Sequence, residues 1–243
     1  IYAEGGCILD CTIVSNRTAF GGGVCTHGAN VTVISNCLIW ANTGDGGGIF
    51  IGGVSNFIYQ TKVLNNSGGS GVRQTGNAFY NGMTIISNSG YGLKQSAGGL
   101  IALHNSLIAD NTGDYRAGVE LINPTGTVIN CTIVGNSATN VSSWNGGLYV
   151  NGSGSLLVNN LVAVSNFAAS TTPNILCSQS VIYHSCWPEA TTPANGNITN
   201  DPAFVNYADG DYRLSHGSRC INTGTNQGWM ADALDLDGRM RQD

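Results

Sequence analysis

The stretch TIVSNRTAFGGGV at Thr12–Val24 returns as TIVGNSATNVSSWNGGLYV at Thr132–Val150, more than a hundred residues later. Both stretches contain a short apolar run, an asparagine, a polar segment, a glycine pair and a second apolar run. Self-similarity of this kind is the sequence signature of a repeat architecture. The asparagine therefore serves as the reference position for reading the rest of the chain.

An asparagine closes a short apolar run at intervals of 22 to 30 residues. A second reference point is an apolar residue directly after glycine. From this residue onward, successive side chains alternate between inward and outward positions, and this period of two indicates β-strands. Irregular repeats of short strands and Gly/Asn turns predict an all-β fold, a right-handed parallel β-helix of about 7–8 coils with a C-terminal capping segment. Stacked coils lie about 4.8 Å apart, so identical amides can hydrogen-bond from coil to coil. The predicted structural ladder consists of Asn16, Asn42, Asn66, Asn88, Asn111, Asn136 and Asn166.

The composition limits the classes of partner. Charged residues make up 9% of the chain, the formal net charge is −5, and no cluster of Lys and Arg occurs. Nucleic acid is normally bound by several basic groups, so we expect no nucleic-acid partner. We also expect no membrane span, because no run of apolar residues is long enough to cross a bilayer.

Two parts of the sequence resemble known families. The phrases TIVSN and GGGV are similar to the coils of secreted bacterial right-handed β-helix proteins and to the repeats of polymorphic outer-membrane adhesins. The segments DPAFVN at Asp201–Asn206, GDYRLSHGSRCINTG at Gly210–Gly224 and DLDGRMR at Asp235–Arg241 resemble the module that follows the β-helix in choice-of-anchor Q domain proteins. This resemblance implies an extracellular or cell-surface location.

We divide the chain into the β-helix coils, residues 1–175, and residues 176–243, which hold a last irregular coil, a loop and the C-terminal cap. We expect the segment from Asp201 to fold back over the open end, because a terminal coil otherwise exposes its core and its strand edges. The first coil begins in mid-coil at Cys7–Asn16. For the same reason, we expect self-association or upstream sequence to complete that edge.

The eight cysteines are compatible with an oxidising compartment. Cys11 and Cys37 share one column of adjacent coils, where the spacing of stacked Cβ atoms exceeds that of an ordinary disulfide, so both a thiol pair and a disulfide stay open. Three further cysteines lie in loop segments, whose backbone can adjust to the geometry of a disulfide more easily than stacked strands can: Cys177, Cys186 and Cys220. One bridge among these three would tie the cap to the coils.

One outward column of the coils predicts a binding face. Aromatic rings stack on sugar rings, and charged groups between them bind hydroxyls or carboxylates. Ordinary surface decoration is the competing interpretation. The predicted glycan-binding residues are Phe50, Arg73, Lys94, Glu120 and Tyr149.

A polysaccharide lyase or glycoside hydrolase is the alternative function. Such enzymes need a calcium-binding carboxylate cluster and a base, or carboxylates at set separations. Asp45 shares a column with Asp114, but three coils place them about 14 Å apart. A denser group, for which a surface ion pair is the competing interpretation, supplies the catalytic candidates Lys94, Asp114, Arg116 and Glu120.

The segment DALDLDGR brings Asp232, Asp235 and Asp237 close together. Oxygen-rich loops of this kind hold Ca²⁺, although the spacing lacks the closing Glu of an EF-hand loop, and a structural turn is the competing interpretation. We expect no other cofactor. The sequence therefore predicts an extracellular β-helix module with a structural, adhesive or glycan-binding role, whose partner is a glycan or a surface protein.

Overall fold

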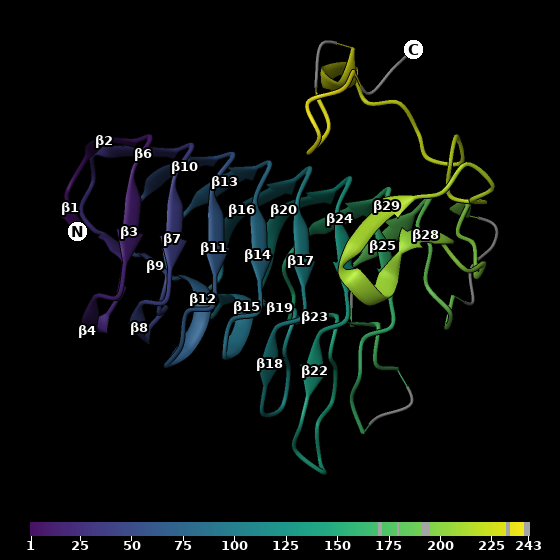
Figure 1. The fold of residues 1–243 in the computed structure, drawn as a ribbon, viewed down its shortest axis with the longest axis horizontal. Coiled ribbons are helices and arrows are strands. Elements are labelled where there is room, and N and C mark those ends of the chain that lie inside the picture. The colour runs from purple at the N-terminus through teal and green to yellow at the C-terminus, as the bar shows by residue number, and fades with distance from the viewer. Residues whose placement is uncertain (170–171, 179, 191–194, 232–233, 241–243) are drawn as a thin grey trace.

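The computed structural model describes residues 1–169, 172–178, 180–190, 195–231 and 234–240. The chain coils repeatedly in one direction, and each turn adds one strand to each of three parallel sheets (Figure 1). The described residues form no α-helix. The predicted fold class, an all-β parallel solenoid of about seven turns, is confirmed. No helix in the described part of the chain is long and apolar enough to cross a membrane.

The three sheets follow one another around each turn. Sheet A contains β1 (Tyr2–Ala3), β5 (Val24–Thr26), β9 (Ile49–Ile51), β12 (Gly69–Gln74), β15 (Gly90–Gln95), β19 (Val119–Ile122), β23 (Leu148–Asn151) and β26 (Ile175–Cys177). Sheet B contains β2 (Gly6–Leu9), β6 (Val31–Ser35), β10 (Ser55–Tyr59), β13 (Ala78–Asn81), β16 (Gly99–His104), β20 (Pro124–Ile129), β24 (Leu156–Asn159) and β27 (Val181–Tyr183). Sheet C contains β3 (Thr12–Val14), β7 (Leu38–Trp40), β11 (Lys62–Leu64), β14 (Thr84–Ile86), β17 (Leu107–Ala109), β21 (Thr132–Val134) and β25 (Val162–Val164).

Shorter elements lie outside these sheets. The loops from sheet C to sheet A carry two parallel strand pairs, β4 (Arg17–Phe20) with β8 (Thr43–Asp45) and β18 (Thr112–Gly113) with β22 (Ser137–Ala138). An antiparallel hairpin of β28 (Phe204–Asn206) and β29 (Asp211–Leu214) and two 3₁₀ helices, η2 (Tyr207–Asp209) and η3 (Gly228–Met230), belong to the tail, which we define as residues 201–240.

Each turn has two sharp corners that use left-handed backbone. Asn36 has a φ of 52° between sheets B and C, and Ala41 has a φ of 54° between sheet C and the following loop. Equivalent corner residues of the other turns also have positive φ, for example Asn65 and Ser87. Non-glycine residues rarely adopt this conformation, so neighbouring contacts must hold it in place.

An asparagine ladder supplies those contacts beside the second corner. The Oδ1 atom of Asn66 accepts hydrogen bonds from the backbone N–H and from the Nδ2 atom of Asn42, at 2.8 and 3.1 Å. The Nδ2 atom of Asn66 donates to the backbone carbonyl of Ile39 and onward to Asn88. The same bonds join all seven predicted asparagines in order, and six of the seven are buried; Asn16, at the start of the ladder, is exposed. The buried amides are therefore satisfied by neighbouring turns.

The ladder extends one residue beyond the prediction. The Oδ1 atom of Asn174 accepts from the backbone N–H and the Nδ2 atom of Asn166, at 3.0 and 3.1 Å. The Nδ2 atom of Asn174 in turn donates to the carboxylate of Glu189, at 2.9 and 3.2 Å. Only eight residues separate Asn174 from Asn166. That interval is far shorter than the spacing used to find the other members, so the repeat pattern misses it.

Glycines just before sheet A let the backbone pass close to this ladder. A Cβ atom at Gly48 would lie 2.5 Å from Cγ1 of Val63 and 3.1 Å from Nδ2 of Asn66. Any larger residue would force the loop away from the buried amides. The glycine reference point in the sequence therefore has a packing cause.

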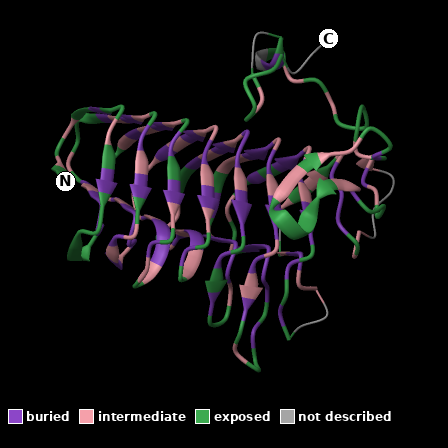
Figure 2. Cartoon of the chain, in the orientation of Figure 1, coloured by how far each residue is buried: buried purple, intermediate pink, exposed green. Residues whose placement is uncertain are grey.

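The tail lies along the side of the solenoid, which differs from the predicted position over the open end (Figures 1 and 2). Phe204 and Tyr212 pack against a small apolar cluster on the outer face of sheet C, and the Tyr212 hydroxyl donates to the Asp110 carboxylate at 2.8 and 2.9 Å. In the later turns, the outward side chains of sheet C in this cluster are small and apolar, so the hairpin can pack closely over them. Trp187, only 7% exposed, belongs to the main core in the last turn. The buried members of the outer cluster are Ala109, Val134 and Val164.

We predict that Asn111→Ala lowers the free energy of unfolding by about 1–3 kcal/mol, because the buried amides above and below lose their partners. Asn111 is fully buried and bonded to both neighbouring turns. Chemical denaturation monitored by circular dichroism measures the change.

Asn151→Ala is the matched control. Asn151 is exposed at the end of β23, so its replacement should change the free energy of unfolding by less than about 0.5 kcal/mol. Equal stability of the Asn111→Ala variant and the unmodified chain would remove the ladder as a source of stability.

Candidate functional site

The predicted outward column lies in register across five neighbouring strands of sheet A. Phe50 pairs with Arg73, Arg73 with Lys94, Lys94 with Glu120, and Glu120 with Tyr149. The structure thus brings all five predicted residues together. We call this column, with the loop residues that contact it, the sheet A face.

Arg73 belongs to a partly exposed group at the N-terminal end of the sheet A face. Its guanidinium forms an ion pair with Asp45 of β8 and lies 5.7 Å from the centroid of the Phe50 ring. The Phe50 ring meets the exposed ring of Phe20 edge to face, with centroids 5.7 Å apart. Cation and aromatic rings are therefore adjacent here, as in many sites that bind planar or ring-shaped ligands.

Glu120 is held at the centre of the face by two neighbours. Nη1 of Arg116 donates to Oε2 of Glu120 at 2.9 Å, with 18% of the Arg116 and 7% of the Glu120 side chain exposed. The pKa of Tyr91 is raised to about 12, first by burial of its hydroxyl and then by Glu120, whose negative carboxylate accepts a hydrogen bond from that hydroxyl. The carboxylate is thus bound to a cation and to a neutral phenol.

Tyr149 is covered by the same arginine. The Arg116 guanidinium lies 3.8 Å from the centroid of the Tyr149 ring and 5.1 Å from that of Trp144. Only 5% of Tyr149 and 5% of Glu120 is exposed. The structure therefore differs from the predicted open column, because the loop that carries Arg116 packs over these two residues. In their place, Arg116 and Trp144 form the outer surface.

Lys94 occupies the middle of the face without a carboxylate. Its Nζ atom lies 4.6 Å from the centroid of the Tyr91 ring, and the ion pairs of the described residues do not include it. Its strand neighbour Glu120 is already engaged by Arg116. The half-buried ammonium therefore has no carboxylate partner among the described residues.

The sequence reasoning missed a row of aromatic residues in the loops. Phe20, Tyr115 and Trp144 are 58%, 49% and 52% exposed. Each stands four residues before the first residue of a sheet A strand, a regularity that the sequence contains. The backbone N–H of Trp144 donates to the carbonyl of Tyr115 at 3.1 Å, so these two rings stand on adjoining loops beside the sheet A face.

The catalytic candidates are only partly gathered. Lys94, Arg116 and Glu120 share the sheet A face, whereas Asp114 is exposed on the loop after β18, and no hydrogen bond or ion pair of its carboxylate occurs within the described ranges. Asp45 is paired with Arg73 in an earlier turn. The described residues therefore do not provide a pair of adjacent carboxylates on this face.

The calcium candidates lie in the tail. Oδ1 of Asp235 accepts from the backbone N–H groups of Asp237 and Arg239, at 2.9 and 2.8 Å, which is the geometry of a turn. Asp232 falls outside the described residues. Within the described ranges, no three His, Cys, Asp or Glu side chains gather as a metal-binding group.

Comparisons with known proteins agree with this architecture. A family model described as "Right handed beta helix region" matches residues 1–167. The crystal structure of pectate lyase Pel9A is similar over 93% of this chain and 68% of that chain, with a TM-score of 0.52 and 15% sequence identity. At that identity, the similarity concerns the fold alone. No curated protein sequence matches the chain.

We predict that Arg116→Met lowers the free energy of unfolding by about 2–4 kcal/mol. The substitution would leave the Glu120 carboxylate, with 7% of its side chain exposed, without its cation, and breaking a buried ion pair on one side is costly. Thermal and chemical unfolding of the purified variant measure the loss.

The double variant Arg116→Met with Glu120→Gln is the control for this prediction. A glutamine at position 120 is uncharged, so the double variant should recover part of the stability that the single variant loses. If the single variant unfolds like the unmodified chain, the pair is not a stabilising contact.

Proposed function

Because the chain belongs to the family of right-handed β-helix proteins, we propose that it is an extracellular polysaccharide-binding module that uses the sheet A face. The matched region, residues 1–167, contains every residue of this face. The ligand that suits the face is an anionic polysaccharide, one that carries carboxylate or sulfate groups.

The proposal rests on the position of Lys94, whose ammonium has no carboxylate partner among the described residues. The two carboxylates nearest to Lys94 along this face are already paired, Glu120 with Arg116 and Asp45 with Arg73. The Lys94 ammonium contacts the face of the Tyr91 ring instead. A ligand carboxylate or sulfate would complete the interaction by a charge-assisted hydrogen bond.

The length of the face favours an extended ligand. Phe50 and Tyr149 are separated by four strand-to-strand steps of sheet A, or about 19 Å along the solenoid axis. The exposed rings of Phe20, Tyr115 and Trp144 border this length and offer apolar surfaces to sugar rings. A polymer can contact several of these groups at once, which a single sugar cannot.

Binding fits the site better than bond cleavage does. Glycoside hydrolysis generally uses two carboxylates with separate roles, and the carboxylate in this cluster, Glu120, is already fixed by a cation. The similarity to pectate lyase Pel9A concerns the fold. A polysaccharide lyase or hydrolase activity is therefore the less well supported alternative, and cleavage of the polymer would reveal it.

We predict that the chain binds polygalacturonate more tightly than a neutral polysaccharide such as dextran, and that Lys94→Ala weakens this binding about tenfold. The loss corresponds to one charge-assisted hydrogen bond. Isothermal titration calorimetry at two salt concentrations measures the affinity, which should fall as salt rises.

Lys62→Ala is the matched control, because Lys62 and Lys94 are the two lysines of the chain and Lys62 is exposed on sheet C. Affinity should be unchanged in this variant. Equal weakening by both substitutions, or no preference for the charged polymer, would contradict the proposal. Release of unsaturated products or new reducing ends would replace binding by catalysis.

A further inference from the structure

The tail makes few buried contacts of its own. Among its residues with described side-chain burial, only Pro202, Ser218 and Met230 are buried. The hairpin reaches the solenoid through Tyr212 and Asp110, and the segment beyond it reaches sheet B through Thr225, which hydrogen-bonds to Asn159 and Asn160. Apart from the packing of Phe204 and Tyr212 on sheet C, the tail therefore has little buried apolar surface to keep it in place.

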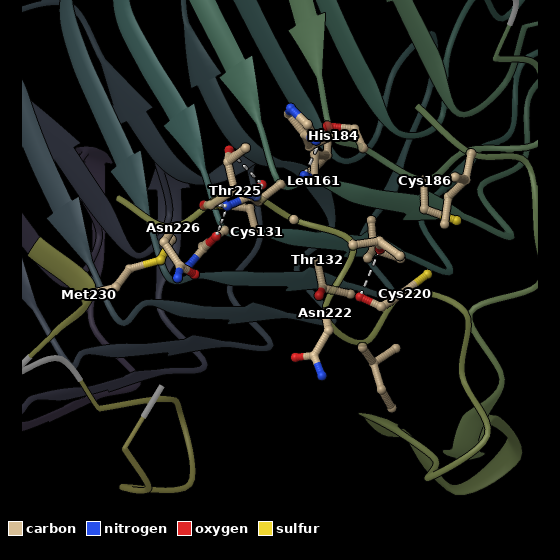
Figure 3. A pocket seen from close by; sticks show the side chains of 18 residues that line it. Cys131, Thr132, Leu161, His184, Cys186, Cys220, Asn222, Thr225, Asn226 and Met230 are labelled. Carbon is tan, nitrogen blue, oxygen red and sulfur yellow. Dashed lines mark hydrogen bonds between the residues drawn. The ribbon is translucent and has the colours of Figure 1, made fainter. Parts of the chain in front are cut away.

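A pocket of about 290 Å³ lies between the tail and the last turns (Figure 3). Cys186, which follows β27, and Cys220, from the tail, both line it. Cys186 is 2% exposed, and its thiol donates to the backbone carbonyl of Asn200 at 3.0 Å. Figure 3 shows the Cys186 and Cys220 side chains at the same end of the pocket, and each thiol is the largest influence on the pKa of the other. Two neighbouring thiols, one from the last turn and one from the tail, therefore face each other across this pocket.

Two other cysteines, Cys177 and Cys131, lie near this region and have contacts of their own. Cys177 packs against the main core, where burial raises the pKa of its thiol to about 12. Cys131 also lines the pocket, but it is buried, and its thiol proton is shared between the carbonyls of Leu103 and Ile129. Cys177 is thus separated from Cys186 and Cys220, which share the pocket.

We propose that Cys186 and Cys220 form a disulfide that ties the tail to the last turn of the solenoid. The bond requires an oxidising compartment, so its presence in the cell rests on the extracellular location in the proposed function. The pairing itself depends only on the geometry of the two thiols.

Oxidation would proceed by thiol–disulfide exchange with a disulfide-bearing oxidant, either an oxidoreductase or oxidised glutathione. The neighbouring Cys186 thiol lowers the pKa of Cys220, whereas the pKa of Cys186 itself is raised, so Cys220 is the attacking thiolate. It forms a mixed disulfide and releases one oxidant thiolate. Cys186, after losing its proton to solvent, displaces the second. Two protein thiols are thereby oxidised as one oxidant disulfide is reduced to two thiols.

The closed loop would contain the strands that hold the tail on sheet C. Residues 186 and 220 enclose β28 and β29, and therefore also Tyr212 with its bond to Asp110. Cross-links that close long loops restrict the unfolded chain most. The disulfide would therefore keep the tail attached even when its non-covalent contacts open.

The test uses the full chain, refolded in a glutathione redox buffer, denatured in acid and alkylated without reductant. Peptide mapping should show a cross-linked peptide that contains Cys186 and Cys220, with the six other cysteines alkylated. Trypsin cleavage after Arg219 should give fragments that stay joined until dithiothreitol is added. These results do not depend on whether the chain binds a polysaccharide.

Two variants complete the experiment. Cys177→Ser should retain the cross-link, and Cys220→Ser should leave Cys186 alkylated and lower the melting temperature to that of the reduced, unmodified chain. Alkylation of all eight cysteines in the unmodified chain, or a cross-link from Cys186 or Cys220 to Cys177, would overturn the proposal.

Discussion

The side-chain carbonyl of each ladder asparagine after Asn16 accepts two hydrogen bonds from the preceding member of the ladder, and this shared acceptor fixes the register of the solenoid. A slip of one residue would break both bonds and send the inward side chains of that turn outward. The ladder thus does more than satisfy buried amides. It places equivalent residues of successive turns side by side, and the sheet A face exists because Arg73, Lys94 and Glu120 are equivalent in this sense.

The loops from sheet C to sheet A vary because the ladder and the glycines restore the register after each of them. Asn88 and Leu93 are five residues apart, whereas Asn136 and Leu148 are twelve apart, yet both leucines enter sheet A in register. Lengthening a loop adds little to the entropy cost of closing it. Side chains such as Trp144 can therefore be added beside the sheet without disturbing the core. The variable part of each turn is where a binding surface can be built at the lowest cost in stability.

Sequence periodicity predicts the structural features that recur in successive turns, but it misses the features that occur in one turn only. The ladder asparagines and the five-residue column recur at a fixed place in each turn, so periodicity finds them. Burial of Glu120 and Tyr149 depends on Arg116, which stands in one loop and has no counterpart in the other turns. Asn174 joins the ladder after an interval of eight residues, which no repeat length predicts. The position of the tail depends on a patch of small apolar residues on sheet C, including Val134, whose meaning appears only when the hairpin lies against it.

The last turn of a stacked solenoid, like the first, has a neighbouring turn on one side only, so it lacks half of the stacking contacts of an inner turn. Within it, the ladder ends at the Glu189 carboxylate, and β26 and β27 are the final strands of their sheets. The tail contacts earlier turns, at Asp110 and Asn160. A covalent bond between Cys186 and the tail would therefore link the last turn to those earlier turns directly. Opening of the last turn would then also have to strain or break the tail contacts, which nearest-neighbour stacking alone does not require. Because the tail lies against sheets B and C, this gain in stability would leave the sheet A face open.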